Sequence, residues 1–118
     1  HDRTLVGLVA FDDQEYKGTR YQWCGKEPFQ FTLSAKKGQA HTLHLLWGAK
    51  GDQRAAVLTL NGQPRAVAHG GYDGFQWLKV PIEAGMVTGD SLTVRVAPDP
   101  QAAGKPAAFL SEARLTAP

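Results

Sequence analysis

Cysteine is nearly absent from this chain of 118 residues, which contains one Cys and one Met. Cys24 alone cannot form an internal disulfide, and no second Cys is available for a Cys-based zinc site. The cysteine content leaves the cellular compartment open, because a lone buried thiol is also tolerated in secreted domains.

Long apolar runs and a strong excess of charge are also missing. No stretch approaches the roughly 18 consecutive apolar residues of a membrane helix, and the N-terminus lacks the basic-then-apolar order of a signal peptide. The 13 Lys and Arg nearly balance the 11 Asp and Glu, and no three basic residues are consecutive. We therefore expect a mature or excised soluble domain that neither enters a membrane nor binds nucleic acid through charge alone.

What remains is the composition of one ordinary domain, with 42% hydrophobic and 20% charged residues. The length excludes a two-domain enzyme, and the apolar content excludes intrinsic disorder. We therefore predict a single domain over residues 1–118.

Apolar and polar residues alternate along most of the chain, and turn residues recur about every eight to twelve positions. This pattern is typical of an antiparallel β-sandwich, because alternation gives each strand one buried side. The sequence therefore predicts an all-β fold with strands near residues 4–11, 21–24, 29–34, 41–47, 55–60, 65–69, 75–80, 92–96 and 108–115. The predicted loops are 48–53, 69–74 and 98–106, and residues 83–89 are predicted to contain one helical turn. The predicted core contains Phe29, Phe31, Leu33, Leu43, Leu45, Leu92, Val94 and Val96.

The strongest local signal is Asn61-Gly62, which separates two alternating segments. Asn followed by Gly tolerates the positive φ angles of a tight β-turn better than most dipeptides do. We therefore predict a hairpin with its turn at these two residues.

Residues 45–62 read as a strand ending in Trp-Gly, a Gly-containing loop, an Arg, and a second strand that ends in Asn-Gly. This segment resembles the galactose-binding-like jelly-roll modules, especially the C-terminal β-sandwich domain of bacterial β-L-arabinofuranosidase-type glycosidases. The resemblance extends over residues 27–116 and implies a jelly-roll sandwich within a secreted carbohydrate-active protein. The matching positions are Trp47, Gly48, Gly51, Arg54, Asn61 and Gly62.

Two segments combine aromatic and polar side chains in the way that sugar-binding sites require. Aromatic rings stack on the apolar faces of sugars, and planar polar groups hydrogen-bond neighbouring hydroxyls. Residues 16–23 and 69–77 supply both, and the candidate contacts are Arg20, Trp23, His69, Tyr72, Asp73, Phe75 and Trp77. The alternative is core packing, which we favour for Trp23 and Trp47 because Trp is usually buried.

Trp77 is the most informative of these candidates. If Leu78 and Val80 face the core, the alternation of the strand turns Phe75, Trp77 and Lys79 to the opposite face. An aromatic pair on that face is either a binding platform or a docking surface.

A structural calcium ion is implied by the resemblance, because related jelly-roll modules often hold one between an early loop and a carboxylate of the last strand. Glu112 resembles that carboxylate. Asp12, Asp13 and Glu15 follow the first strand, as a site of hard oxygen ligands requires. The alternative, which we favour for these three carboxylates, is a solvated acidic turn.

Motifs for catalysis are missing: the serines lack a nucleophile-elbow context, and there is no phosphate-binding Gly-rich loop or His-Glu-x-x-His motif. We therefore predict that the domain is not an enzyme. One alternative is that His1 chelates copper with a second imidazole, as in secreted copper oxidases of polysaccharides. The candidates for that imidazole are His41, His44 and His69. We favour the simpler explanation that His1 is a tag remnant or an arbitrary start.

The sequence thus predicts a non-catalytic carbohydrate-binding module of a secreted multidomain protein. It would bind an oligo- or polysaccharide, accompany a catalytic domain, require no cofactor, and lie in a secreted or periplasmic location. The alternative is a structural accessory domain of a glycosidase with no ligand of its own. The two functions differ in whether Tyr72, Phe75 and Trp77 line a free groove or are buried against a neighbouring domain.

Overall fold

The structure, a computed structural model, describes residues 4–23, 28–101 and 108–118, with only the backbone of Trp23. The predictions for His1 and Cys24 therefore lie outside the described residues.

The described residues form ten β-strands and one turn of 3-10 helix. The strands are β1 (Thr4–Ala10), β2 (Gln14–Tyr16), β3 (Thr19–Trp23), β4 (Phe29–Ser34), β5 (His41–Lys50), β6 (Gln53–Leu60), β7 (Gln63–Gly70), β8 (Asp73–Ile82), β9 (Ser91–Pro98) and β10 (Phe109–Ala117). The 3-10 turn, η1 (Ala84–Met86), falls within the predicted helical turn.

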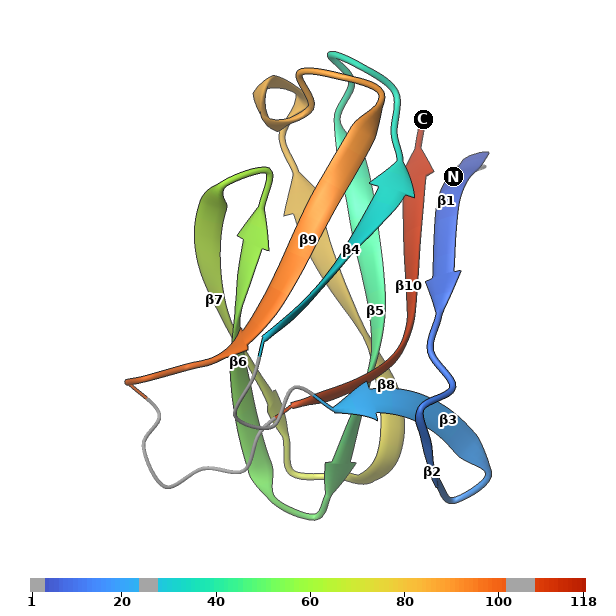
Figure 1. The fold of residues 1–118 in the computed structure, drawn as a ribbon, viewed down its shortest axis with the longest axis vertical. Coiled ribbons are helices and arrows are strands. Elements are labelled where there is room, and N and C mark those ends of the chain that lie inside the picture. The colour runs from blue at the N-terminus through green and yellow to red at the C-terminus, as the bar shows by residue number, and fades with distance from the viewer. Residues whose placement is uncertain (1–3, 24–27, 102–107) are drawn as a thin grey trace.

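Two antiparallel sheets lie face to face as a sandwich (Figure 1). The six-stranded sheet has the order β2-β3-β10-β5-β8, and β1 pairs with the part of β10 beyond its contact with β3. The four-stranded sheet has the order β4-β9-β6-β7. The predicted all-β antiparallel sandwich is confirmed. In the part of the chain that the structure describes, no helix has the length and apolar character needed to cross a membrane.

The core lies between the two sheets and contains the predicted residues. Seven of them are buried: Phe31, Leu33, Leu43, Leu45, Leu92, Val94 and Val96. Phe29 is half-buried and packs against their cluster. Because neighbouring residues of a strand point to opposite faces, the alternation in the sequence specifies which side chains meet between the sheets.

The hairpin predicted at Asn61-Gly62 is confirmed, with a two-residue turn between β6 and β7. Asn61 and Gly62 have φ angles of 48° and 86°, the positive values that a tight hairpin turn requires. The Asn61 side chain also donates from Nδ2 to Met86 O at 2.9 Å and accepts at Oδ1 from Thr93 N at 2.7 Å. The turn is therefore joined to β9 and η1.

Two segments that the sequence predicted to be loops, 48–53 and 69–74, are mostly strand, so this prediction was wrong. In each, two long strands continue to a two-residue turn. Gly51 and Gly71 adopt φ angles of 80° and 77°, so the glycines form tight turns rather than a long irregular loop. The two turns are hydrogen-bonded to one another through their backbones, which places the β5–β6 and β7–β8 hairpin ends side by side.

Candidate functional site

The six-stranded sheet has one face toward the core and an opposite face, here called the outer face, which is partly open to solvent. Residues directly opposite each other in antiparallel strands point to the same side of a sheet. The register of β8, β5 and β10 places Trp77, Leu46 and Glu112 in one row of the outer face. The adjacent row contains Lys79, His44 and Arg114.

Trp77 is the exposed aromatic side chain of this face, with 47% of its surface open to solvent. The Arg114 guanidinium lies over its ring, 5.2 Å from the centroid, a distance at which a cation is attracted to the π-system. Arg114 Nε also donates to Glu112 Oε1 at 2.6 Å. These contacts hold the guanidinium over the indole ring.

A pocket of about 310 Å³ opens beside Trp77 and is lined by His44, Lys79 and Arg114 as well. His44 Nε2 lies 3.0 Å from Thr116 Oγ1, which fixes the orientation of its ring. An exposed indole bordered by fixed polar groups has the two parts of a sugar subsite, a flat apolar platform and directional hydrogen-bonding partners.

Phe75 shares the outer face with Trp77, as the alternation predicts, but it packs within the protein. Its ring lies 5.5 Å from Phe109 and 6.2 Å from Tyr21, centroid to centroid. The hairpin of β2 and β3 carries Tyr21 over this part of the sheet, and the sequence analysis did not predict β2. Phe75 is therefore a half-buried packing residue. Of the predicted aromatic pair, Trp77 is the one whose ring is exposed to a ligand.

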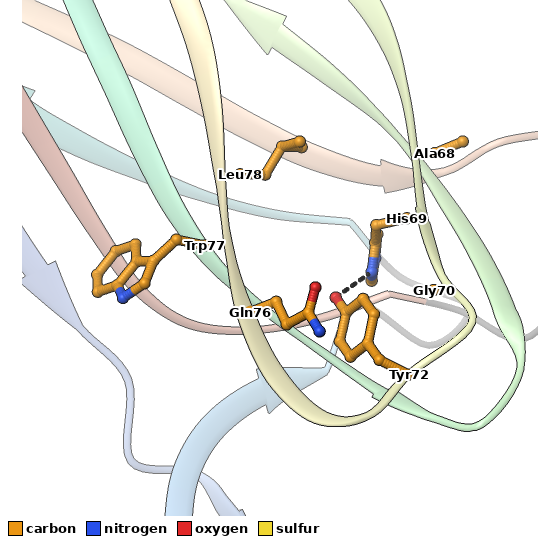
Figure 2. A pocket seen from close by; sticks show the side chains of 7 residues that line it. All are labelled: Ala68, His69, Gly70, Tyr72, Gln76, Trp77 and Leu78. Atoms are coloured by element: carbon orange, nitrogen blue, oxygen red, sulfur yellow. Dashed lines mark hydrogen bonds between the residues drawn. The ribbon is translucent and has the colours of Figure 1, made fainter.

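His69 and Tyr72 line a second, smaller pocket of about 210 Å³, between β7 and β8 at the side of the sandwich (Figure 2). His69 Nδ1 lies 3.0 Å from the Tyr72 hydroxyl, which in turn donates to Trp47 O at 3.3 Å. Figure 2 shows the Trp77 side chain on the other side of β8, pointing away from this pair. Trp77 therefore lines this pocket together with His69 and Tyr72, but its indole ring lies on the opposite side of β8 from the pair.

The His69 ring is also stacked on Trp47, with centroids 4.8 Å apart and planes at 19°. Burial, with a smaller contribution from the Arg54 guanidinium, lowers the pKa of His69 to about 4. The imidazole is accordingly neutral near pH 7, and its Nε2 is buried with no hydrogen-bond partner among the described residues. His69 is therefore a half-buried residue that packs on Trp47, and its role as a sugar contact stays a prediction.

Asp73 and Arg20 belong to the end of the molecule where the β2–β3 hairpin meets the β7–β8 turn. Asp73 accepts hydrogen bonds from the Tyr16 hydroxyl at 2.5 Å and from Lys17 Nζ at 2.6 Å. These bonds, from Lys17 first and Tyr16 second, lower the pKa of Asp73. Arg20 is exposed, and strand alternation turns it away from the face that carries Tyr21.

The backbone of Trp23 pairs with Phe109, whereas its side chain is outside the described part of the structure. The predicted sugar contacts are thus distributed over several places, and Trp77 alone lines the pocket of the outer face. Its neighbours His44, Lys79 and Arg114 were not among the predicted contacts. The alternation of β8 already placed Lys79 beside Trp77, but nothing local relates Arg114 to either residue.

The matched positions of the jelly-roll resemblance form scaffold. Trp47 is fully buried. Arg54 is also buried, donates from Nε to Asp52 Oδ1 at 2.9 Å, and has its guanidinium 4.8 Å from the Phe109 ring centroid. The hydrogen bond from Arg54 lowers the pKa of Asp52.

The carboxylates of the predicted calcium site are exposed to solvent or hydrogen-bonded to another side chain. Asp12, Asp13 and Glu15 are exposed, and Glu112 is half-buried against Arg114. Among the residues that the structure describes, no three His, Cys, Asp or Glu side chains are grouped so that they could hold a metal ion. Calcium binding therefore stays a prediction from the sequence.

No protein-family model matches the chain, and no curated protein matches it in sequence. Solved structures do match its fold. The CBM36-1 domain of a multidomain xylanase from the hindgut metagenome of Trinervitermes trinervoides is 12% identical with a TM-score of 0.62, and the match covers 99% of this chain and 98% of that one. A family 35 carbohydrate-binding module from an environmental isolate is 16% identical with a TM-score of 0.62, over 96% of this chain and 84% of that one.

The Podospora anserina GH26-CBM35 β-(1,4)-mannanase is 17% identical with a TM-score of 0.65, over 99% of this chain. The chain spans only 11% to 26% of the length of three larger structures that it matches, the mannanase among them. These likenesses establish the predicted jelly-roll sandwich as the fold of the chain. The finer resemblance to β-L-arabinofuranosidase-type glycosidases stays a prediction.

Proposed function

We propose that this domain binds carbohydrate without catalysing a reaction, and that the sugar stacks against Trp77 on the outer face. The observation that carries the proposal is the 47% exposed indole bordered by Arg114, Lys79 and His44. Elsewhere in the described residues, large aromatic rings are buried or half-buried. A flat exposed ring supplies stacking, while the neighbouring nitrogen atoms supply the directional bonds that select among sugars.

The fold supports the same function. Its structural neighbours include two carbohydrate-binding modules and the mannanase named above. We propose that the domain accompanies a catalytic domain in a larger protein, and that it is secreted or periplasmic, where polysaccharides are met. A fold alone does not define a function, so the proposal depends on the Trp77 site.

The test is retention of the isolated domain in native gels that contain mannan, xylan or arabinan. We expect at least one polymer to retard the wild-type domain, and Trp77→Ala to weaken that binding at least about fivefold, which corresponds to about 1 kcal/mol. Leu5→Ala is a matched control, because Leu5 is 51% exposed on the outer face but does not line the pocket. Its binding should equal that of the wild type.

A structural accessory role is the second candidate, and one observation favours it. Leu5, Leu8 and Trp77 are 51%, 52% and 47% exposed, and the register places all three on the outer face. Exposed apolar residues that share a face often mark a docking surface. The accessory role is the better account if no polymer retards the wild-type domain, or if Trp77→Ala unfolds it.

A further inference from the structure

Among the described residues, the pocket beside Trp77 is lined by side chains that carry nitrogen and by no carboxylate. Its described lining consists of His44, Lys79, Arg114 and the indole itself. Ammonium and guanidinium groups donate hydrogen bonds and accept none. A neutral sugar presents hydroxyls that act as donors and as acceptors, whereas a carboxylate or sulfate presents acceptors only. The charged lining groups therefore suit an anionic group better than a hydroxyl.

The positive charge of this pocket is only partly compensated. Glu112 accepts a hydrogen bond from Arg114 Nε at 2.6 Å. A guanidinium has further N–H donors beyond that one. Lys79 is exposed and forms no ion pair with another described residue, in contrast to Lys17 and Arg54. Together, Lys79, Arg114 and Glu112 leave an excess of positive charge beside the aromatic platform.

The charges also lie where a substituent of a stacked sugar would reach. The Arg114 guanidinium is 5.2 Å from the Trp77 ring centroid. Lys79 follows Trp77 by two positions on the same strand face, and both line the same pocket. A sugar ring against the free part of the indole would therefore direct an exocyclic group toward these two cations.

We propose that the sugar bound beside Trp77 carries a carboxylate or a sulfate group, which Lys79 and Arg114 recognise. This inference rests on the proposed function and adds the chemical class of the ligand. Hydrogen bonds between charged groups are shorter and stronger than those between neutral groups, so the charge should appear as a preference over an otherwise identical neutral glycan.

The experiment compares matched polymers by affinity electrophoresis or titration calorimetry. Polygalacturonate is paired with its fully methyl-esterified form, and a sulfated galactan with its desulfated form. We expect the charged member of at least one pair to bind at least about fivefold more tightly than its neutral partner. The pair that shows the preference identifies the anion, and the preference should weaken as salt is raised.

Two lysine variants separate a specific contact from diffuse attraction between a cationic domain and a polyanion. Lys79→Gln should remove most of the preference, measured as the ratio of the variant's affinities for the charged and the neutral member of the pair. Lys37→Gln removes the same charge from an exposed residue between β4 and β5 that does not line the pocket, and the preference should persist.

The proposal is overturned if charged and neutral polymers bind equally, or if Lys37→Gln reduces the preference as much as Lys79→Gln does. Neutral polymers that bind through Trp77 without any gain from charge would leave the carbohydrate function intact and remove only this inference. If no polysaccharide of either kind binds, the inference and the proposed function both fail.

Discussion

The rings of His69 and Trp47 lie nearly parallel, with centroids 4.8 Å apart, at the end of the core near the β7–β8 turn. His69 belongs to the four-stranded sheet and Trp47 to the six-stranded sheet, so the pair joins the two layers. The Tyr72 hydroxyl bonds to both residues, to the imidazole of His69 and to the carbonyl of Trp47. His69, which the sequence predicts as a sugar contact, thus packs half-buried between the two sheets.

The pH dependence of stability tests this placement. Burial lowers the pKa of His69 from 6.5 to about 4, so between these values the unfolded chain binds a proton that the folded chain does not. Stability should therefore fall as pH decreases from 6.5 to 4, and this contribution should level off below that window. His69→Phe keeps an aromatic ring against Trp47 but has no titrating group at this position. Over this pH range, the melting temperature of His69→Phe should therefore decrease by at least about 4 °C less than that of the wild type. Equal decreases in the melting temperatures of the two proteins over this pH range would show that His69 is accessible to solvent.

Gly48 is needed because the Phe109 ring occupies the space where a side chain would be. A Cβ at this position would lie 1.9 Å from Phe109 Cε2. Gly48→Ala should displace Phe109 and destabilise the domain by about 1–3 kcal/mol in urea unfolding. Gly89→Ala is the control, because a Cβ there meets no atom within 4 Å. Equal midpoints for the two variants would contradict the packing of Phe109 over β5.

Asn61 contributes both a backbone conformation and side-chain hydrogen bonds. Asn61→Ala removes the bonds to Met86 and Thr93 and places alanine, which tolerates a positive φ less well than asparagine does, at a φ of 48°. We expect it to lower the free energy of unfolding by about 1–3 kcal/mol. Asn61→Gly relieves the backbone strain but still lacks the bonds, so it should recover only part of the loss. Full recovery would show that the hydrogen bonds contribute little.

Much of the sandwich could be predicted because strand alternation is a local signal. Phe31 and Leu33 on β4, and Val94 and Val96 on β9, reach the core that their period-two pattern specifies. The Asn61 turn was predictable for the same reason, since its φ requirement is a property of the dipeptide.

The candidate site was less predictable because it depends on register between distant strands. Arg114 reaches Trp77 only through the pairing of β10 with β5 and of β5 with β8. β10 also contains an irregularity between Leu110 and Glu112, which shifts the register, so counting along the sequence does not give the face of Arg114. The sequence predicts Phe75 as half of an aromatic platform, because nothing local indicates that the β2–β3 hairpin packs against its ring.

Calcium binding is tested by melting the domain in excess chelator and in millimolar calcium. The hypothesis from the sequence, with Glu112 and the residues near Asp12 as ligands, predicts a higher midpoint in calcium by mass action. A calcium-bound Glu112 would have to share its carboxylate with Arg114, which now donates to Oε1 at 2.6 Å. Glu112→Gln should then abolish the calcium effect. Identical midpoints for the wild type under both conditions would remove calcium from the account.

The most direct test of the Trp77 site is an NMR titration of the ¹⁵N-labelled domain with an oligosaccharide of the polymer that retards it. The indole N–H signal of Trp77, assigned by its loss in Trp77→Phe, should shift in a saturable way. The signal of Trp47, whose Nε1 is buried, should stay in place. A saturable titration that leaves the Trp77 signal unmoved and shifts the amides of His69 and Tyr72 instead would contradict the account.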